Sequence, residues 1–495
     1  MRRPRRLPMA ARATLLVTLA AAVAGTLAGR RRVRGASARA VLGQARLRRN
    51  AEVARLGARV GGRYAAGTAR KVFASAERRV ALDRERELRT AADVAETLGQ
   101  MKGALMKLGQ MASYLDEGLP EPLRAALAQL QHEAPPMAPE LAAQVVEAEL
   151  GAPPEAVFLE WDPIPIAAAS IGQVHRARWW DPERQEERAV AVKVQYPGVA
   201  DAIEADLANA DLLGAILAQA FRGLDPGPLV GELRARIIEE LDYEREARDQ
   251  RRFAAFYAGH PTIHVPQVVD ACSTRRVLTT DLVGGAPWSD LVTWDQKERD
   301  AAAETIYRFV FRSLYTLHSF NGDPHPGNYR FHGDGRVTFL DFGLVKHFTP
   351  HEMAVFQRMI THAVIDTDWA AFRAEVEQAG LLQAGAPVST EAVGSYFEVF
   401  YESVRTRDEH TWTPDYASAA VRQVWDRSSP IAPYATVPPA FVIIQRINMG
   451  LYAILGQLRA RGNFRAIAEE LWPMVQAPPS TRLGAAEAAW LAART

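Results

Sequence analysis

Apolar positions recur with helical spacing over most of the chain and with strand spacing in a few short regions. Between about Tyr64 and Leu130 they alternate in steps of four and three residues, which predicts a long helical region with one apolar stripe. A proline-rich break follows. The next segment, Pro139 to Leu150, predicts a short helix that Gly151 should end.

Strand-like alternation begins soon afterwards and predicts a β-hairpin. Its strands would be Ser170–Trp180 and Arg188–Gln195, with the turn around Asp181-Pro182. In the second strand three valines share one face, so Lys193 is expected on the opposite face.

The remainder of the chain is mainly helical, with two further β-like pieces. Helical sequence runs from Val199 to about Ala258, and a strand is expected over Arg276 to Val283. A helix from Ala301 to Phe320 precedes a β-rich piece between Tyr329 and Leu340.

Composition bounds the class of protein. The chain has 495 residues, of which 48% are hydrophobic and 24% are charged, and this excludes a disordered or collagen-like chain. At roughly 150 residues per domain we expect about three domains. The single cysteine, Cys272, excludes a disulfide framework and a cysteine-based metal site.

Charge is distributed unevenly, although 59 basic residues nearly balance 58 acidic ones. The first 51 residues contain 13 arginines and no acidic residue. Such a basic segment suits a membrane surface, a targeting signal or nucleic acid. No aromatic residue lies among the arginines to stack on bases, so we expect no nucleic-acid partner.

An apolar run, Ala13 to Gly29, lies within this basic segment, and its 17 residues are at the short limit for spanning a bilayer. A membrane anchor, a cleaved signal, a transit peptide and a tail without a role remain alternatives. We expect the protein on the cytoplasmic side of a membrane or associated with one, with organellar targeting through a transit peptide as the alternative.

Two segments carry the residues of a metal-dependent phosphoryl transfer. In DPHPGN, Asp323 and Asn328 are five residues apart, which is the spacing of the catalytic Asp and the metal-binding Asn in kinases. Asp341 of a DFG triplet follows 13 residues later. Asn328 and Asp341 would bind Mg²⁺ on the phosphates, while Asp323 would orient the attacking hydroxyl.

Lys193, in the centre of AVAVKVQ, would hold the nucleotide phosphates, as in the kinase V-A-I-K strand. Its acidic partner would come from the following EELDYEREA helix, where Glu240, Asp242 and Glu246 are candidates and Glu246 is preferred. A solvated acidic face is the alternative for these three residues.

A run of small residues stands where a kinase has its glycine-rich loop. It consists of Ala167, Ala168, Ala169 and Ser170, and its glycine comes only at Gly172. Alanine leaves the backbone accessible to phosphate but restricts φ. Alone this would be a turn of small residues, but its place in kinase order before Lys193 favours a phosphate-covering loop.

The histidines of the C-terminal half give no metal site. His347 and His351 are four residues apart without a third ligand nearby, which favours a surface pair. For His325, inside DPHPGN, we expect a role in packing the turn.

Taken together, these motifs resemble those of the UbiB/AarF (ADCK-type) family of atypical protein-kinase-like proteins. The resemblance covers roughly Thr90 to Phe464, and two of its motifs, K-x-G-Q and the alanine loop, are specific to the family. The motifs are Lys107-Leu108-Gly109-Gln110, PIAAASIGQVH, AVAVK, the E-x-D pair Glu240 and Asp242, DPHPGN and LDFG.

The resemblance implies a two-lobed protein-kinase-like α+β fold with a small β-rich N-lobe, a helical C-lobe and an N-terminal helical extension. The expected segments are a basic and apolar start, the extension, the N-lobe, the C-lobe and a C-terminal tail, over residues 1–35, 36–145, 146–285, 286–475 and 476–495.

The resemblance also implies roles for the extension. Lys107 and Gln110 would point into the cleft, where Lys107 would meet Glu240 and Asp242 and occupy the place of a peptide substrate. The alanine loop is associated with a shifted preference towards ADP. The implied cofactors are therefore ATP or ADP, with Mg²⁺.

By the same resemblance the protein would be an atypical kinase or ATPase that supports isoprenoid quinone (ubiquinone or menaquinone) or lipid metabolism at a membrane. A nucleotide-gated lipid- or partner-binding pseudokinase and a soluble small-molecule kinase of the aminoglycoside or choline type are the alternatives. Partners would be a nucleotide, a membrane lipid or quinone precursor and quinone-biosynthesis enzymes, with a homodimer as an option.

The chain departs from the family pattern at one position. The family has a histidine two residues before the catalytic Asp, and this chain has Asn321 there. Kinases normally use the residue at this position for backbone support, and we expect that its replacement does not abolish the chemistry. As is normal for the family, the A-P-E segment of ordinary kinases is absent, and a helix should start at Thr349-Pro350.

Overall fold

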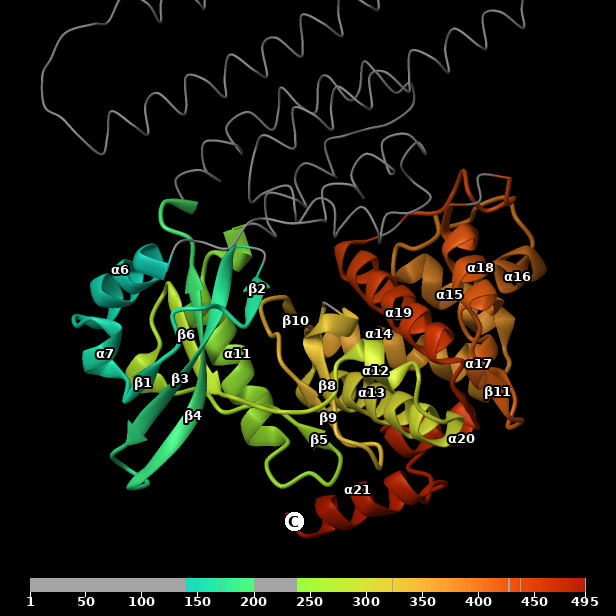
Figure 1. The fold of residues 1–495 in the computed structure, drawn as a ribbon. Helices are drawn as coiled ribbons and strands as arrows, with labels where there is room; N and C mark the ends of the chain where they lie inside the picture. Colours follow the sequence, from blue (N-terminus) through green and yellow to red (C-terminus); the bar gives the residue numbers. More distant parts are fainter. Residues whose placement is uncertain are drawn as a thin grey trace, which may run out of the picture. The chain divides into compact units, whose positions relative to one another are not determined.

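The computed structural model describes residues 139–169, 171–199, 238–322, 324–425, 428–436 and 438–494. They form two lobes, which lie side by side in Figure 1. We call residues 139–283 the N-lobe and residues 284–494 the C-lobe. The expected helical region between Tyr64 and Leu130 and the basic segment 1–35 lie outside the described residues.

The N-lobe is built on a five-stranded antiparallel sheet in the order β1-β3-β4-β6, with β2 paired to β3. The long strands β3 and β4 form the hairpin that the alternating pattern predicts. The strands are β1 (Glu160–Trp161), β2 (Ala167–Ala169), β3 (Gly172–Asp181), β4 (Glu186–Gln195) and β6 (Val277–Asp281).

Each face of this sheet has its own helix (Figure 1). The three valines of β4 are fully buried and pack with Val145 and Val146 of α6 (Pro139–Leu150), which is followed by α7 (Pro154–Val157). Gly151, at a φ of +79°, ends α6 as expected. Since neighbouring residues of a strand point to opposite faces, Lys193 lies on the other face, towards α11 (Tyr243–Phe256).

The C-lobe surrounds α13, half of whose residues are buried. The elements outside the sheet and helices already named are β5 (Ile263–His264), η1 (Asp270–Cys272), α12 (Trp288–Leu291), α13 (Gln296–Leu317), β7 (Ser319–Asn321), η2 (Pro326–Asn328), β8 (Tyr329–Phe331), β9 (Val337–Phe339), β10 (Val345–His347), α14 (Pro350–Ile360), η3 (Thr361–Ile365), α15 (Trp369–Gln378), α16 (Thr390–Glu398), α17 (Glu402–Arg405), β11 (His410–Thr411), α18 (Pro414–Trp425), α19 (Pro439–Leu458), β12 (Arg461–Gly462), α20 (Phe464–Leu471) and α21 (Arg482–Ala492).

Local side-chain and backbone interactions set the ends of α13 and the start of α14. α13 begins at Gln296 rather than at Ala301, because the Asp295 side chain accepts from the Glu298 amide at 2.9 Å and caps the helix. It ends at Leu317 because His318 adopts a left-handed conformation. α14 starts after Thr349, as the sequence predicts, with a full capping box.

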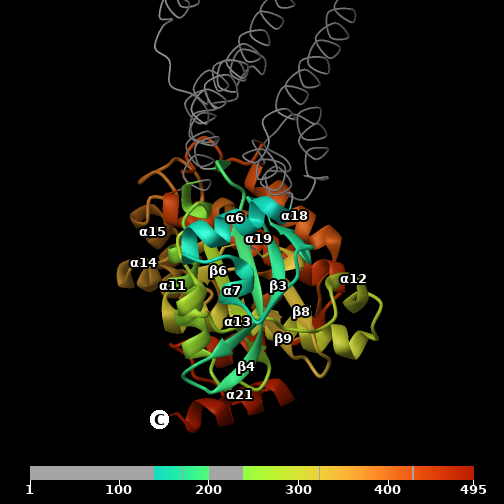
Figure 2. The ribbon, with the colours of Figure 1, turned by 60° about the vertical axis from the view of Figure 1, so that its left-hand side comes forward.

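Short strands connect α13 to the segments expected to carry the chemistry. β5, β9 and β8 form one small sheet and β10 pairs with β7 in another. β9 contacts α13, and in Figure 2 the β8–β9 pair lies close to that helix. DPHPGN therefore lies between β7 and β8, and the DFG triplet follows β9. Among the described residues, no helix combines the length and apolar character needed to cross a membrane.

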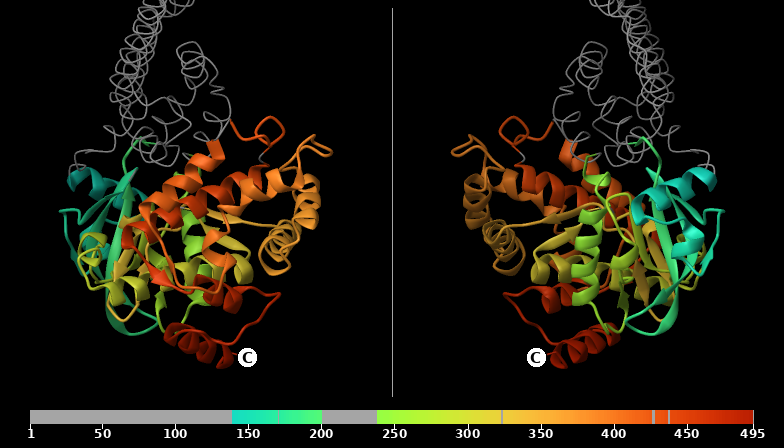
Figure 3. Two further views of the ribbon diagram at one scale, coloured as in Figure 1. Left: turned by 90° about the vertical axis from the view of Figure 1, so that its right-hand side faces the viewer. Right: turned by 90° about the vertical axis from the view of Figure 1, so that its left-hand side faces the viewer.

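The last helix, α21, lies in the segment 476–495, which the sequence suggests only as a tail (Figure 3, red, beside the C mark). It is attached to α13 by buried ion pairs. Arg308, 0% exposed, lies 2.7 Å from Glu304, 2.8 Å from Glu470 and 2.9 Å from Glu487. Arg312 lies 3.0 Å from Glu487. Three carboxylates around one buried guanidinium make this contact specific in geometry.

The Glu487 carboxylate, 1% exposed, should make stability depend on pH. Burial alone would raise its pKa, but neighbouring His260 and Arg312 and the charges of Arg312 and Arg308 lower it to about 2. The folded state thus binds this proton less readily than the unfolded state, whose pKa is near 4.5. Its contribution, on the order of 3 kcal/mol, is present above pH 4.5 and is lost as the pH falls towards 2.

We therefore expect Glu487→Gln to lower the free energy of unfolding at pH 7 and to flatten its fall between pH 5 and pH 3. Chemical denaturation at several pH values measures both effects. Glu409→Gln, at an exposed glutamate, is the matched control and should change neither. An unchanged pH dependence in Glu487→Gln would contradict this account of the α21 contact.

Candidate active site

A cavity of about 360 Å³ lies between the N-lobe sheet and the DPHPGN and DFG segments. Its size is within the usual range for small-molecule sites. Apolar side chains from both lobes and a cluster of charged ones line it. The apolar lining includes Ile166, Val174, Ala191, Leu278 and Leu340, and the charged lining includes Lys193, Glu240, Glu246, Asp281, Arg330 and Asp341.

Three of the expected site residues meet in this cavity. Lys193 Nζ on β4 donates to both carboxylate oxygens of Glu246 on α11, at 2.8 and 2.9 Å. Asp341 Oδ2, from the segment after β9, lies 3.9 Å from the same ammonium. Glu246 is 5% exposed, whereas Lys193 and Asp341 are 20% and 33% exposed. The ion pair thus lies at the back of the site and Asp341 faces the open space.

The charges of these groups depend on one another. Burial lowers the pKa of Lys193, but the carboxylates of Glu246 and Asp341 outweigh this and raise the pKa well above its usual value. Burial raises the pKa of Glu246 to about 7; Lys193 opposes the rise and Asp341 adds to it. The negative charge of Asp341 thus disfavours the ionised form of Glu246. A further cation beside Asp341 would offset this effect.

The DFG segment is held by its aromatic residue. Phe342 is fully buried, with its ring centroid 5.0 Å from that of Phe253 on α11 and 6.5 Å from that of Phe309 on α13. Asp341 Oδ1 accepts from the Gly343 amide at 2.9 Å. Phe342 thus ties Asp341 both to the helix that carries Glu246 and to the C-lobe core.

The DPHPGN segment lies directly beside the DFG segment. The Leu340 amide donates to the Asn328 carbonyl at 2.9 Å, and Asn328 lines the cavity. His325 Nδ1 accepts from the Gly327 amide at 3.1 Å, a contact within the turn of the kind expected for it. Asp323 lies outside the described residues.

The alanine segment forms an edge strand. Ala167, Ala168 and Ala169 make up β2, paired antiparallel to β3, and all three line the cavity. Ser170 lies outside the described residues. Gly172 opens β3 next to the Val194 carbonyl, which a Cβ at this position would overlap. The glycine is therefore required by sheet packing, and the backbone of β2 is fixed by strand pairing.

The acidic residues of EELDYEREA have different positions. Asp242 caps α11 by accepting from the Arg245 amide at 3.1 Å, whereas Glu240 lines the cavity together with Glu246. Lys107 and Gln110, expected opposite Glu240 and Asp242, lie outside the described residues.

The donor set can be compared with Mg²⁺, which prefers oxygen ligands and keeps several of its ligands as water or phosphate. No group of three or more His, Cys, Asp or Glu side chains suited to a metal occurs in the described part of the chain. Asn328 and Asp341 instead offer one amide oxygen and one carboxylate at the same wall of the cavity. This pair fits a Mg²⁺ ion that a nucleotide brings with it.

Comparison with known proteins identifies the family. The profile of the ABC1 atypical kinase-like domain matches residues 129–375. The structure titled as the complex of Rv3197 with erythromycin, from Mycobacterium tuberculosis, superposes with a TM-score of 0.58 and 32% sequence identity. That match covers 77% of this chain and 95% of the other.

This chain belongs to the UbiB/AarF family of ABC1 atypical kinase-like proteins.

Curated relatives in this family include the mitochondrial atypical kinase COQ8 of Saccharomyces cerevisiae, 30% identical over 57% of this chain and 56% of the relative. Another is an uncharacterized chloroplastic aarF domain-containing protein kinase of Arabidopsis thaliana, 28% identical over 74% of this chain and 52% of the relative. The chain spans about half the length of these two relatives. The α+β, two-lobed kinase-like fold expected from the sequence is confirmed.

At the one departure from the UbiB/AarF pattern, Asn321 makes a backbone contact. Its Nδ2 donates to the Asp341 carbonyl at 2.5 Å, and it lies on β7, opposite Val345 of β10. An amide at this position thus links the strand before DPHPGN to the backbone of the DFG segment.

Sequence reasoning did not identify Tyr243. Its ring centroid lies 4.9 Å from Lys193 Nζ, and the side chain is buried at the wall of the cavity. The hydroxyl has no hydrogen-bond partner among the described residues, and burial raises its pKa. The sequence feature that could have identified it is its spacing: Tyr243 precedes Glu246 by three residues and therefore lies on the same face of α11.

Asn321 offers a test of the contact between the two segments. Asn321→Leu should lower the free energy of unfolding by about 1–3 kcal/mol, since it leaves the Asp341 carbonyl without its donor. It should also speed amide exchange at residues 341–344. Asn321→His restores a side-chain donor and should recover much of both losses, measured by denaturation and hydrogen-exchange mass spectrometry. If the leucine variant exchanged at the normal rate, the contact would have no such role.

Proposed function

We propose that this protein is a Mg²⁺-dependent nucleotide phosphotransferase or ATPase that supports isoprenoid quinone or lipid metabolism at a membrane surface. The proposal is carried by the cluster of Lys193, Glu246 and Asp341 in an open cavity. Phosphoryl transfer needs a fixed cation for the phosphates and oxygen ligands for a metal ion, and these residues supply both.

The nucleotide would bind with its base between the apolar side chains of the sheet and Leu340 of the C-lobe. Lys193 would hold the α- and β-phosphates, and Glu246 would fix the position of the ammonium. The backbone of β2 and Ser170 would cover the phosphates. Because β2 is a paired strand, this cover would be stiffer than a glycine-rich loop.

Asn328 and Asp341 would hold Mg²⁺, which would neutralise charge on the phosphate oxygens. Asp323 would orient the hydroxyl of water or of an acceptor and take its proton. The γ-phosphorus would then gain a bond to that oxygen and lose its bond to the bridging oxygen, releasing ADP. Lys107 and Gln110, near Glu240 and Asp242, would control access to the cavity.

We infer that the reaction takes place at a membrane surface from two features: the basic and apolar segment 1–35, and membership of the family. The arginines would attract anionic lipid, which would bring the cavity close to lipid-soluble substrates. The printed names of curated relatives place those proteins in mitochondria or chloroplasts, so organellar targeting stays the alternative for this chain. Enzymes of quinone biosynthesis would be its partners.

The decisive measurement is phosphate release from Mg²⁺-ATP by the full-length protein, with and without anionic liposomes. We expect turnover that rises with liposomes and falls at least a hundred-fold in Asp341→Asn and Asp323→Asn. Glu298→Gln, at a partly exposed site on α13 away from the cavity lining, is the matched control for removing a carboxylate charge. Nucleotide binding without turnover under every lipid condition would instead favour the nucleotide-gated binding module.

Gly450 offers a second test, because α19 packs directly against the DPHPGN segment there. A Cβ at Gly450 would overlap the ring of Pro324, next to Asp323. Alanine is favoured over glycine within a helix by up to about 1 kcal/mol, so Gly450→Ala should fold. The overlap must shift the segment, and a displacement near 1 Å can lower turnover by about a hundred-fold.

We therefore expect Gly450→Ala to lose turnover far more than affinity for Mg²⁺-ATP, because the shifted segment would supply one metal ligand, Asn328, whereas Lys193 and Glu246 lie in the N-lobe. Gly462→Ala is the matched control, since its Cβ meets nothing closer than 3.7 Å. Steady-state kinetics and nucleotide titration separate the two effects. Equal turnover in both variants would show that the position of the DPHPGN segment does not limit the reaction.

A further inference from the structure

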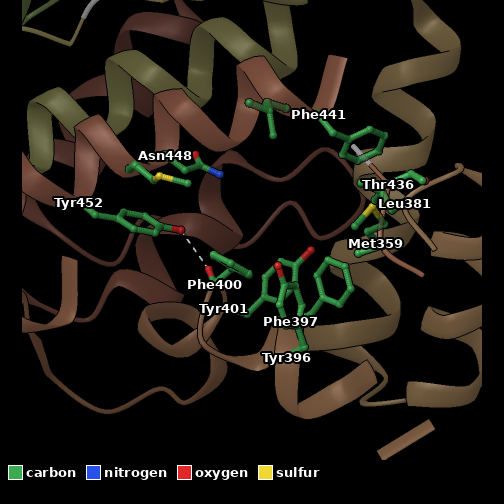
Figure 4. Close-up of a pocket in the computed structure, with 13 residues that line it drawn as sticks. Met359, Leu381, Tyr396, Phe397, Phe400, Tyr401, Thr436, Phe441, Asn448 and Tyr452 are labelled. Atoms are coloured by element: carbon green, nitrogen blue, oxygen red, sulfur yellow. Dashed lines mark hydrogen bonds between the residues drawn. The ribbon is translucent and has the colours of Figure 1, made fainter. Parts of the chain in front are cut away.

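The C-lobe contains a second cavity, separate from the candidate active site, with a volume of about 130 Å³ (Figure 4). Residues from α14, α16 and α19 and from the segments 381, 400–401 and 435–436 line it, so its walls come from parts of the chain far apart in sequence. The lining residues are Met359, Leu381, Tyr396, Phe397, Phe400, Tyr401, Ala435, Thr436, Phe441, Ile444, Asn448, Met449 and Tyr452.

The size of the cavity limits what can occupy it. An engineered protein cavity of about 150 Å³ with an apolar lining binds benzene. This cavity is slightly smaller but is open to solvent on one side, so it would hold one six-membered ring with a small substituent at the opening. A nucleotide or a whole lipid chain would be too large for it.

Packing behind the walls keeps the cavity open. The ring centroid of Phe397 lies 5.2 Å from that of Phe372, and the centroid of Phe441 lies 5.0 Å from that of Phe356. Tyr452 packs on Trp412 at 4.9 Å. Side chains that are fixed by neighbouring rings cannot easily collapse into the space, and a preformed cavity lowers the cost of binding.

Two polar groups of the lining, the Asn448 amide and the Tyr401 hydroxyl, make no hydrogen bond with a described residue. The Tyr452 hydroxyl donates to the Phe400 carbonyl at 3.0 Å, and the Thr436 hydroxyl donates to the Gly380 carbonyl. Asn448 makes no hydrogen bond with any described residue, and Figure 4 shows its amide extending from α19 towards the cavity. A ligand oxygen could accept a hydrogen bond from this amide.

The lining also determines the charge of the ligand. None of the described residues that line the cavity is charged. An ionised ligand would lose its hydration without gaining a counter-charge, which is costly. A carbonyl oxygen can accept from both the Asn448 amide and the Tyr401 hydroxyl, and it brings no hydrogen of its own that would need a partner among the aromatic side chains.

We propose that this cavity binds an uncharged six-membered ring that carries one carbonyl group, with the ring between the aromatic side chains and the oxygen at Asn448. This site is distinct from the nucleotide cavity and does not depend on the function proposed for that cavity.

Three probes of similar shape test the proposal on the full-length protein by ligand-observed NMR titration. Acetophenone has the carbonyl, α-methylstyrene replaces its oxygen by carbon, and benzoate adds a charge. We expect acetophenone to bind about three- to ten-fold more tightly than α-methylstyrene, which is the effect of one hydrogen bond. Benzoate should not bind. Asn448→Leu should remove the preference for acetophenone and leave the binding of α-methylstyrene intact.

Matched leucine substitutions at two alanine positions, one in each cavity, locate the site. Ala435→Leu fills this cavity and should weaken both neutral probes at least ten-fold, whereas Ala191→Leu makes the same change in the nucleotide cavity and should have no effect. If Ala435→Leu lacks a cooperative thermal transition, Ile444→Phe fills the same space from α19. The proposal is overturned if the probes fail to bind, if benzoate binds as well as acetophenone, or if Ala191→Leu rather than Ala435→Leu abolishes binding.

Discussion

The ion pair between Lys193 and Glu246 is the constraint on which the arrangement of the site depends. It joins the middle of a sheet to the first turn of α11, so both elements must be in register for the charges to meet. Burying an ammonium and a carboxylate costs several kcal/mol for each ion unless they are paired well, and a single unpaired partner would be strongly destabilising. The two Nζ–O contacts at 2.8 and 2.9 Å satisfy that requirement. They also fix the position of α11, on which Phe253 receives Phe342 and so places Asp341.

Much of this arrangement could be predicted from local patterns. The alternation of β4 assigns the valines and Lys193 to opposite faces, and the spacing within EELDYEREA puts Glu246 on the face that a helix presents to the sheet. The fold class follows from the family motifs. The boundaries of helices were predicted less exactly. The pattern places the start of α13 at Ala301, but the helix starts at Gln296, because the Asp295 side chain caps it there.

Other features could not be predicted, because they form between distant segments. Four residues of α16 and its adjoining turn meet α19 at the second cavity, yet each appears in the sequence as an ordinary core aromatic. Arg308 pairs with Glu304 one turn away on α13, but nothing near residue 308 indicates its other partners, Glu470 and Glu487. Asp242 could have faced the cavity or capped α11, and only the structure distinguishes these two roles. Lys107, Gln110, Ser170 and Asp323 lie outside the described residues, and their roles remain predictions.

The ion pairs of Arg308 have a consequence for how the protein is made. Glu487 follows Arg308 by 179 residues, so at ribosomal rates of 5–20 residues per second their synthesis is separated by about 10 to 35 s. During that interval α13 exists without two of the three carboxylates that neutralise its central arginine. The helix therefore cannot adopt its final buried environment, and the apolar residues around it stay available to chaperones or to aggregation. Completion of the C-lobe is a late event of biosynthesis, even though the segments of the candidate site are already translated.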